Sequence, residues 1–468
     1  MEKVGILVVS YGSRAAAIID TFKHSQEYLT KFYIVDKQKN PFNLKNAEKH
    51  IVISDFNLEE ITKFAKKYRE KIDFGIVGPE KPIIAGIRDL VEKKTKIPMI
   101  CPTKDYAIEG SKIAQRELFQ KVAPDVNPRF KVFDPKEYNS LTQVKKSVYN
   151  WLKELQNQVA VKPDKATAGK GVGVWGDHFN TPKEVFEHFI SNYKHGPVII
   201  EEKVIGEESS FQTLCDGKRL IALPETRDYK RAFDDDKGPN TGGMGSYKDA
   251  SDILPFITRE DKVKEFELVN RIFKELKGKG NNPELRGIPF YAAFIHTSTG
   301  PKILEVNSRP GDPEIMNILP ILDGDFVEIC YNMIDGNLGK VNFKKQATVV
   351  TYKVPPDYGG YATVFPDKIN VEDETSIDLS DAEKLVQNKP NNYRVYPGSM
   401  ELRDGENFAL GSRTVAVVGI GDNIEEARDR SLEGIVAIQG GSLWNRNDIA
   451  LKAHIAKSVK NMKELRRH

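Results

Sequence analysis

The first hundred residues alternate between short apolar runs and amphipathic segments. Residues 3–10 form a continuous apolar run, Ala15 to Phe22 is typical of a helix, and further apolar runs lie at 32–36, 73–80 and 97–101. Short apolar runs separated by helical segments favour a parallel sheet with helices on both faces. We therefore predict one α/β domain over residues 1–103, with binding groups at the carboxyl ends of its strands.

The middle of the chain changes to longer strand-like runs. A helical pattern at 106–120 is followed by residues 121–150, which give no clear signal. Strand-like runs then lie at 158–162, 172–175, 197–202, 209–214 and 219–223, with an amphipathic helix at 261–277. Residues 290–296 and 301–307 predict antiparallel strands around the turn at 298–300. We predict a second domain over residues 104–340.

Beyond residue 340 the apolar runs are short. They lie at 347–353, 393–397 and 414–419, and helical patterns follow at 425–434 and 446–467. The polar stretch 372–392 predicts a loop or the edge of a lobe. Residues 341–468 are therefore predicted to form a small β-rich domain that ends in a helix.

Composition narrows the class of protein. The 468 residues suggest about three domains, and 39% hydrophobic with 29% charged residues favours a folded chain. Seventy basic and 67 acidic residues nearly balance, so nucleic acid is not expected as a partner. No apolar run is long enough to span a membrane. Three widely separated cysteines, Cys101, Cys215 and Cys330, suggest reduced thiols in a cytoplasmic protein.

The segment 228–245 carries the densest chemistry in the chain. It combines four carboxylates with three cations and runs into a loop with three glycines in four positions. Cations suit phosphate and carboxylate groups, carboxylates suit an amine, and glycines let backbone N–H groups close on a ligand. We predict a pocket for a small zwitterion and a phosphorylated sugar. The alternative is a charged surface loop.

Two further segments predict a nucleotide site. A strand ending in Lys162 precedes a loop in which Gly169, Lys170 and Gly171 can close on phosphate oxygens, although a β-hairpin tip would look similar. The apolar run ending in Glu201 and Glu202, with Glu208 beyond it, suits a clamp for adenine and ribose. For either of the first two glutamates alone, an exposed strand end is the competing interpretation.

A third segment predicts a metal site. Glu305 and Asn307 alternate on one face of a strand, and oxygen ligands at that spacing fit Mg²⁺. Arg309 continues that face and can stabilise charge on a transferred phosphoryl group. The alternative is a strand end with a satisfied carboxylate.

The order of these segments resembles the ATP-grasp ligases, and among them the glycinamide ribonucleotide synthetase family. The stretches that carry the resemblance are 77–80, 109–112, 168–172, 200–208, 236–245 and 305–314, with fainter echoes at 411–415 and 446–448. The resemblance implies a multidomain α/β and α+β fold: an N-terminal parallel α/β domain, a two-lobed ATP-grasp core whose mobile lobe is about 130–200, and a small C-terminal β-rich domain.

The resemblance also implies an activity. ATP, glycine and 5-phosphoribosylamine would give glycinamide ribonucleotide, ADP and phosphate through glycyl phosphate, a step of de novo purine synthesis. Mg²⁺ or Mn²⁺ would assist, and the enzyme would act as a monomer in the cytoplasm. Such a phosphoryl transfer needs positioning and charge neutralisation rather than a protein nucleophile.

The family match assigns roles to individual residues. Lys162 and Arg309 would be catalytic, and Glu305 and Asn307 would bind the metal. The residues implied for ATP are Lys112, Lys162, Gly169, Lys170, Gly171, Glu201, Glu202, Lys203, Val204 and Glu208. The residues implied for glycine and the amino sugar are Gly12, Arg14, Glu80, Asp228, Lys230, Arg231, Lys237, Asn240, Thr241, Gly242, Arg309, Gly311 and Asp312.

The chain departs from the family pattern at three places. The usual Gly-Gly-Arg-Glu-His after the first strand reads Gly12-Ser-Arg-Ala-Ala here, and the usual Phe-Asp-Gly-Asp reads Phe233-Asp-Asp-Asp. The strand from Phe290 offers no carboxylate for a second metal ion.

Three other functions compete with this interpretation. The first is another ATP-grasp ligase, such as a formate-dependent transformylase or a carboxylase. The second is a dinucleotide-dependent oxidoreductase, suggested by Gly12 and Asp36, although the Gly-x-Gly-x-x-Gly turn is absent. The third is a non-catalytic nucleotide sensor, against which the presence of both Lys162 and Glu305 argues.

Overall fold

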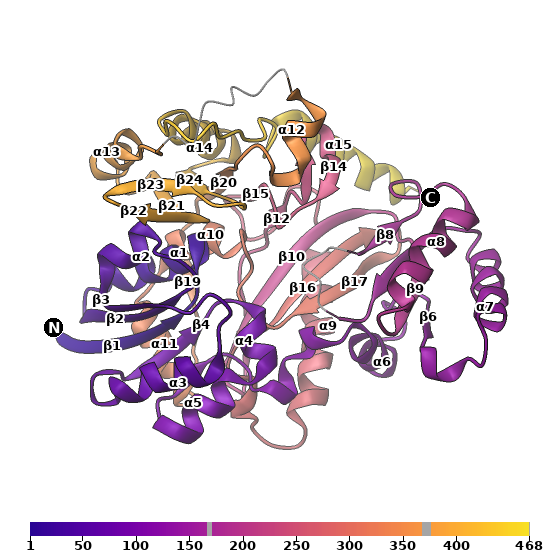
Figure 1. The fold of residues 1–468 in the computed structure, drawn as a ribbon, viewed down its shortest axis with the longest axis horizontal. Helices are drawn as coiled ribbons and strands as arrows, with labels where there is room; N and C mark the ends of the chain where they lie inside the picture. Colours follow the sequence, from indigo (N-terminus) through magenta and orange to yellow (C-terminus); the bar gives the residue numbers. More distant parts are fainter. Residues whose placement is uncertain (166–170, 367–375, 468) are drawn as a thin grey trace.

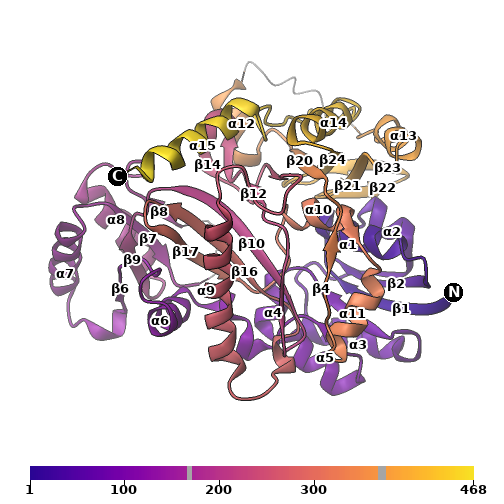
Figure 2. The same ribbon diagram turned by 180° about the vertical axis from the view of Figure 1, so that it is seen from behind.

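A computed structural model describes residues 1–165, 171–366 and 376–467. Figure 1 shows the N-terminal sheet on one side, a small lobe on the opposite side and the C-terminal sheet along the top. From behind, the terminal helix runs above the central sheet toward the small lobe (Figure 2). Across the described residues, none of the helices is both long enough and apolar enough to cross a lipid bilayer.

The N-terminal domain is the predicted parallel α/β unit. Its sheet has the order β3-β2-β1-β4-β5 with every pairing parallel. Helices cover both faces, so residues 6–9 of the first strand are fully buried and read as one apolar run. The strands are β1 (Glu2–Val9), β2 (Tyr28–Asp36), β3 (Ala47–Val52), β4 (Phe74–Val77) and β5 (Met99–Ile100), and the helices are α1 (Gly12–Lys23), α2 (Pro41–Asn46), α3 (Leu58–Lys67), α4 (Glu80–Ala85) and α5 (Ile87–Thr95).

The small lobe is an antiparallel sheet covered by two helices. Its strands have the order β6-β9-β7-β8. Val144, Val148 and Leu152 form the buried stripe of one helix, and they pack with Phe189 in a core separate from those of the other domains. The elements are β6 (Phe130–Phe133), α7 (Leu141–Glu154), β7 (Val159–Pro163), β8 (Gly173–Val174), α8 (Pro182–Tyr193) and β9 (Val198–Glu202).

The central sheet supplies the second lobe. Its order is β11-β10-β16-β17, and the predicted antiparallel hairpin is its β16–β17 pair. Two helices pack against one face through Phe119, Leu268 and Ile272. The elements are α6 (Lys112–Val122), β10 (Glu207–Cys215), β11 (Leu220–Ala222), α9 (Arg259–Lys277), β16 (Gly287–Thr297) and β17 (Gly300–Asn307).

The C-terminal sheet takes two strands from the middle of the chain. Its order is β12-β15-β20-β24-β21, and β12 and β15 flank the predicted acceptor loop, residues 228–245. Both ends of that loop are therefore anchored in the C-terminal sheet. The elements are β12 (Arg227–Asp228), β15 (Gly245–Lys248), β20 (Ala347–Lys353), β21 (Tyr393–Pro397), β24 (Val415–Gly421), α14 (Ile424–Val436) and α15 (Lys452–Leu465).

Shorter elements complete the chain. One of them, helix α13, lies inside the polar stretch that was predicted as a loop, because buried Ala382 packs it against the C-terminal core. The remaining elements are β13 (Arg231–Phe233), β14 (Lys237–Asn240), α10 (Ile315–Ile318), β18 (Leu322–Asp323), α11 (Phe326–Ile334), β19 (Asn342–Phe343), α12 (Tyr361–Val364), α13 (Ser380–Asn388), β22 (Met400–Arg403) and β23 (Glu406–Ala409).

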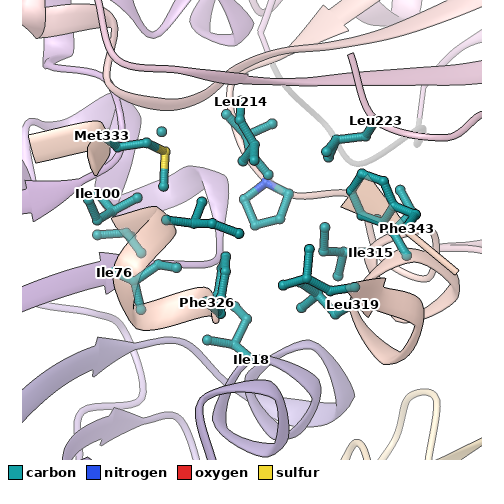
Figure 3. Close-up of a pocket in the computed structure, with 17 residues that line it drawn as sticks. Ile18, Ile76, Ile100, Leu214, Leu223, Ile315, Leu319, Phe326, Met333 and Phe343 are labelled. Carbon is teal, nitrogen blue, oxygen red and sulfur yellow. The ribbon is translucent and has the colours of Figure 1, made fainter. Parts of the chain in front are cut away.

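An apolar seam joins the N-terminal domain to the central sheet. Figure 3 shows Ile18, Ile76 and Ile100 facing Leu214 and Leu223 across a cavity of about 40 Å³. Side chains of α10 and α11 close the cavity, which carries no charged lining residue. The seam fixes the carboxyl ends of the N-terminal strands beside the central sheet by packing.

Candidate active site

The charges of four cations act on one carboxylate, that of Glu305. Glu305 lies near the end of β17, and burial alone would raise its pKa. The charges of Lys112, Lys230, Lys162 and Arg309 outweigh burial and lower the pKa of Glu305, so the carboxylate is ionised. These cations come from α6, the acceptor loop, β7 and the segment after β17. The arrangement suits a polyphosphate whose charge exceeds that of the single carboxylate.

Hydrogen bonds across the two lobes bring Lys112 and Lys162 together. Ser111 caps α6, and its hydroxyl donates to Oδ1 of Asp164 at 2.8 Å. The same oxygen accepts the backbone N–H of Ile113 at 2.9 Å, and the N–H of Lys112 donates to the carbonyl of Asp164 at 3.2 Å. The start of α6 is thus tied to the end of β7, the strand that carries Lys162.

A buried ion-pair chain holds the Lys162 ammonium. Glu201 is 2% exposed, and its two carboxylate oxygens contact Lys162 Nζ and Arg116 Nε, the latter at 2.5 Å. Arg116 also donates to the carbonyls of Ile303 at 3.0 Å and Leu304 at 2.6 Å. Burial raises the pKa of Glu201, but the two cations outweigh it and lower the pKa. Both carboxylate oxygens of Glu201 are occupied by side chains of the protein.

The predicted adenine and ribose residues lie where β9 passes into β10. Glu202 Oε1 is 2.8 Å from Lys302 Nζ, which links the small lobe to the central sheet. The ammonium of Lys203 donates a hydrogen bond to the carbonyl of Trp175 at 2.6 Å. The neighbouring Val204 is half-buried. Glu208 Oε2 lies 3.0 Å from Lys230 Nζ, and the charge of Lys230 lowers the pKa of Glu208.

The predicted metal ligands share one face of β17. Glu305 pairs with Ala293 of β16 and Asn307 with Tyr291, and both ligand candidates are half-buried. An ionised carboxylate and an amide oxygen are hard donors, which suit Mg²⁺ or Mn²⁺. The residues present therefore fit a divalent cation that takes its other ligands from phosphate and water.

Arg309, one of the four cations, also lies close to two further carboxylates. Arg309 Nε is 3.2 Å from Glu80 Oε2 and 3.4 Å from Glu109 Oε1. Arg14, which is 2% exposed, donates to the carbonyl of Pro310 at 3.0 Å. The N-terminal domain thus supplies Arg14 and Glu80 to the region around Arg309, as expected for groups at the carboxyl ends of parallel strands.

The C-terminal domain also reaches this region. Arg413 Nη2 is 3.0 Å from Asp312 Oδ2, and the Tyr352 hydroxyl donates to Asp312 Oδ1 at 3.1 Å. Arg413 further donates to the carbonyl of Gly242 at 2.6 Å. The backbone N–H of Gly311 donates to Gln212 at 2.7 Å. Asp312 and the glycine end of the acceptor loop are thus fixed by one C-terminal arginine.

The acceptor loop carries Asp228 and also Lys230, which is one of the four cations. Burial raises the pKa of Asp228 to about 7, although the charge of Lys230 opposes that shift. Thr241 holds the loop closed, because its hydroxyl donates to the carbonyl of Lys230 at 2.9 Å. Gly242 donates its backbone N–H to the hydroxyl of Tyr358 at 2.9 Å.

Two family models match the chain. One, described as phosphoribosylglycinamide synthetase, N domain, matches residues 4–109. The other, described as phosphoribosylglycinamide synthetase, ATP-grasp (A) domain, matches residues 125–315, so the two together cover more than half of the chain. The chain belongs to the phosphoribosylglycinamide synthetase family.

Full-length relatives support the same family. A phosphoribosylamine–glycine ligase of Methanocella arvoryzae is 36% identical over 464 residues, covering 98% of this chain and 99% of the relative. One of Pyrococcus furiosus is 35% identical, covering 99% of this chain and 98% of the relative. The crystal structure of a phosphoribosylamine–glycine ligase from Thermotoga maritima superposes with a TM-score of 0.72 at 24% identity, covering 95% of this chain and 100% of that one. The last likeness concerns the fold.

Three residues that the family resemblance implies for acceptor binding make other contacts in this structure. Lys237 is 72% exposed and pairs with Asp235 at 3.4 Å. Arg231 is directed to Asp177 of the small lobe at 3.0 Å, and Asn240 lies opposite Arg231 in the β13–β14 hairpin. Gly169 and Lys170 lie outside the described residues.

Two of the three departures from the family sequence can be described in the structure. Asp235 has a φ of 60°, so it occupies the left-handed position where the family usually has glycine, and aspartate tolerates that position better than most residues. Gly12 keeps the family glycine at a φ of 64°, beside Gly398. Ala15 and Ala16 are fully buried, so they pack in the core of the N-terminal domain.

The other residues near Glu305 and Arg309 were not equally predictable from the sequence. Arg116 was not predicted as a site residue, because its partner Glu201 lies 85 residues away in the chain. Glu109 was not predicted either, because its partner Arg309 is also distant in sequence. Arg413 lies in the stretch 411–415, which carries a faint family echo. That echo was the available signal that the C-terminal domain takes part in the site.

Proposed function

We propose that this chain ligates glycine to 5-phosphoribosylamine, converts ATP to ADP and phosphate, and forms glycinamide ribonucleotide in purine synthesis. The curated relatives that match this chain over nearly their full length are named phosphoribosylamine–glycine ligase. The observation that carries the proposal is that four cations from different elements, among them Lys230 of the acceptor loop, together lower the pKa of the Glu305 carboxylate. We further propose that the enzyme acts as a monomer in the cytoplasm, where its three buried free cysteines stay reduced.

On the nucleotide side, Lys112 and Lys162 neutralise phosphate oxygens of ATP. The connection from β9 to β10 borders the base and ribose, with Glu208 as the ribose ligand. Glu305 and Asn307 would hold Mg²⁺ or Mn²⁺, which when bound neutralises phosphate charge. In this arrangement Glu201 acts through Lys162 rather than through the base, because both of its oxygens are occupied by cations.

On the acceptor side, a carboxylate oxygen of glycine attacks the γ-phosphorus, and the bond to ADP breaks. The amine nitrogen of the sugar then attacks the acyl carbon, phosphate leaves, and the nitrogen loses a proton. Asp228 suits the glycine ammonium, and Lys230 with Arg309 suits the transferred phosphoryl group. Arg14 of the N-terminal domain suits the phosphate of the amino sugar, because an arginine fork matches phosphate geometry.

An assay of ADP release tests the proposal. Glycine and freshly generated phosphoribosylamine are supplied singly and together with ATP. Release that requires both acceptors is expected. Release that depends on formate or bicarbonate in place of glycine would assign the chain to another ATP-grasp ligase and overturn the proposal.

A further inference from the structure

The tip of the acceptor loop adopts a backbone conformation that non-glycine residues rarely hold. Asp235 and Asp236 have φ angles of 60° and 53°. Left-handed backbone at such residues persists where surrounding structure fixes it. The question is which part of the molecule does so.

The fixing contacts come from a short C-terminal segment, residues 446–448. The backbone N–H of Asn447 donates to Asp234 Oδ1 at 3.0 Å, and the N–H of Asp235 donates to Asp448 Oδ2 at 2.9 Å. Arg446 Nη1 donates to Asp236 Oδ1 at 3.0 Å. Each of the three aspartates at the tip is therefore held by its own bond from this segment.

Arg446 also reaches the strand that leads into the site. Its Nη1 donates to the carbonyl of Arg231 at 2.9 Å, one residue from Lys230. The guanidinium lies over the ring of Tyr229, with its central carbon 5.0 Å from the ring centroid. Arg446 thus contacts both neighbours of Lys230, whose own side chain turns toward Glu208.

The segment is rigid enough to act as a template. Arg446 is fully buried and binds Asp448 through two bonds, Nε to Oδ1 at 2.7 Å and Nη2 to Oδ2 at 2.6 Å. His454 of helix α15 lies 3.3 Å from Asp448 Oδ2 and 3.4 Å from Asp235 Oδ1. A bidentate arginine–carboxylate pair fixes both partners in direction as well as distance.

We propose that Arg446 and Asp448 are positioning residues for acceptor binding: they hold the loop that presents Asp228 and Lys230, although neither touches a substrate. The inference rests on the proposed function. It gives the C-terminal domain a part in acceptor binding through the contacts of residues 446–448 with the loop.

Two variants test it. Arg446→Met keeps much of the side-chain volume and removes every donor. Asp448→Asn keeps the shape, but an amide offers one acceptor oxygen where the carboxylate accepts from Arg446 and from Asp235. In both we expect kcat/KM for glycine and phosphoribosylamine to fall about ten-fold to a hundred-fold, as displaced catalytic geometry does. The dissociation constant for ADP, measured by calorimetry, should stay within about two-fold of wild type.

Arg428→Met is the matched control. Arg428 donates to the carbonyls of Asn447 at 2.6 Å and Ile449 at 3.1 Å, so it holds the same segment from the side of α14. We expect the acceptor constants of this variant to stay near those of wild type. An equal loss in Arg428→Met would mean that any loosening of the C-terminal domain suffices, and would overturn the specific role.

A rescue distinguishes positioning from general stability. Glycine adopts a positive φ freely, so Asp235→Gly should leave wild-type activity little changed. Combined with Asp448→Asn, it should restore part of the lost kcat/KM, because the tip then needs less support. If Arg446→Met fails to fold, Asp448→Asn and this pair still decide the matter. Wild-type acceptor constants in Asp448→Asn would overturn the inference, whereas absence of acceptor-dependent turnover in wild type would overturn the proposed function.

Discussion

Lys162, which we propose to bind phosphate, is held in place by a chain of ion pairs. Its ammonium contacts Glu201, and Glu201 is held in turn by Arg116. The buried carboxylate fixes the direction of the lysine, and the side chain is 14% exposed, which leaves it accessible to a ligand. A phosphate group can therefore bind Lys162 without first having to order a freely rotating side chain.

We predict that Lys162→Met lowers kcat at least about a hundred-fold, because a charge at the transferred phosphoryl group is lost. Lys121→Met, at an exposed lysine that pairs with Glu275, is the control and should behave as wild type. Steady-state ADP release measures both. Turnover of Lys162→Met near the wild-type rate would remove that lysine from the catalytic assignment.

Asp228 predicts the pH dependence of acceptor use. Burial raises its pKa to about 7, and the carboxylate must be ionised to pair with the ammonium of glycine. Protonation below that pH removes the charge, so kcat/KM for glycine should fall as pH drops through about 7. Asp228→Asn should be slow at every pH and lack this limb. If kcat/KM of the wild-type enzyme for glycine stayed constant from about pH 6 to about pH 8, Asp228 would not be the group that pairs with the ammonium of glycine.

At the scale of elements, helix α9 covers a buried acid pair. Glu265 of α9 and Glu225 are both fully buried, and the Ser209 hydroxyl donates to Glu265 Oε1 at 2.9 Å. Burial raises the pKa of Glu265 to about 8 and that of Glu225 well above its ordinary value. The folded protein therefore keeps protons that the unfolded chain releases near pH 4.5.

Stability should consequently decline as pH rises from about 4.5 to about 8, since the folded state binds more protons over that range. Glu225→Gln removes one of the two groups and should flatten the decline by up to about 1.4 kcal/mol per pH unit. The test is the denaturant midpoint of unfolding, measured at about pH 6.5 and about pH 8 for wild type and variant. A variant whose midpoint tracks wild type at both values would show that the pair is not linked to folding.

Regular elements with strong periodicity were predictable from the sequence, and weakly patterned ones were not. The β16–β17 hairpin and the strands β1, β2, β4 and β5 of the N-terminal domain are confirmed, because each is marked by an apolar run. Strand β3 was not predicted, because its residues are only exposed or half-buried. Helix α7 was not predicted, because its buried stripe of Val144, Val148 and Leu152 is narrow and is surrounded by polar residues. Helix α13 lies in a stretch predicted as a loop or the edge of a lobe, because Ala382 is its one buried residue.

At the scale of the whole molecule, the site combines three domains. Arg14 comes from the N-terminal domain, Glu305 from the central sheet and Arg413 from the C-terminal domain. Sequence motifs indicated which cations and which candidate metal ligands to examine, because charge type and spacing are local, and their roles stay predictions. The partners that hold them are distant in sequence, as Arg116 is from Glu201, and such contacts follow from packing rather than from any local pattern.

The most direct test follows oxygen from glycine to phosphate. The enzyme is supplied with ATP, phosphoribosylamine and glycine labelled with ¹⁸O in both carboxylate oxygens, and the released phosphate is examined by mass spectrometry. Attack of the glycine carboxylate on the γ-phosphorus predicts that each phosphate carries one ¹⁸O atom. Phosphate without label, formed while glycinamide ribonucleotide accumulates, would contradict the acyl phosphate route and the active-site assignment built on it.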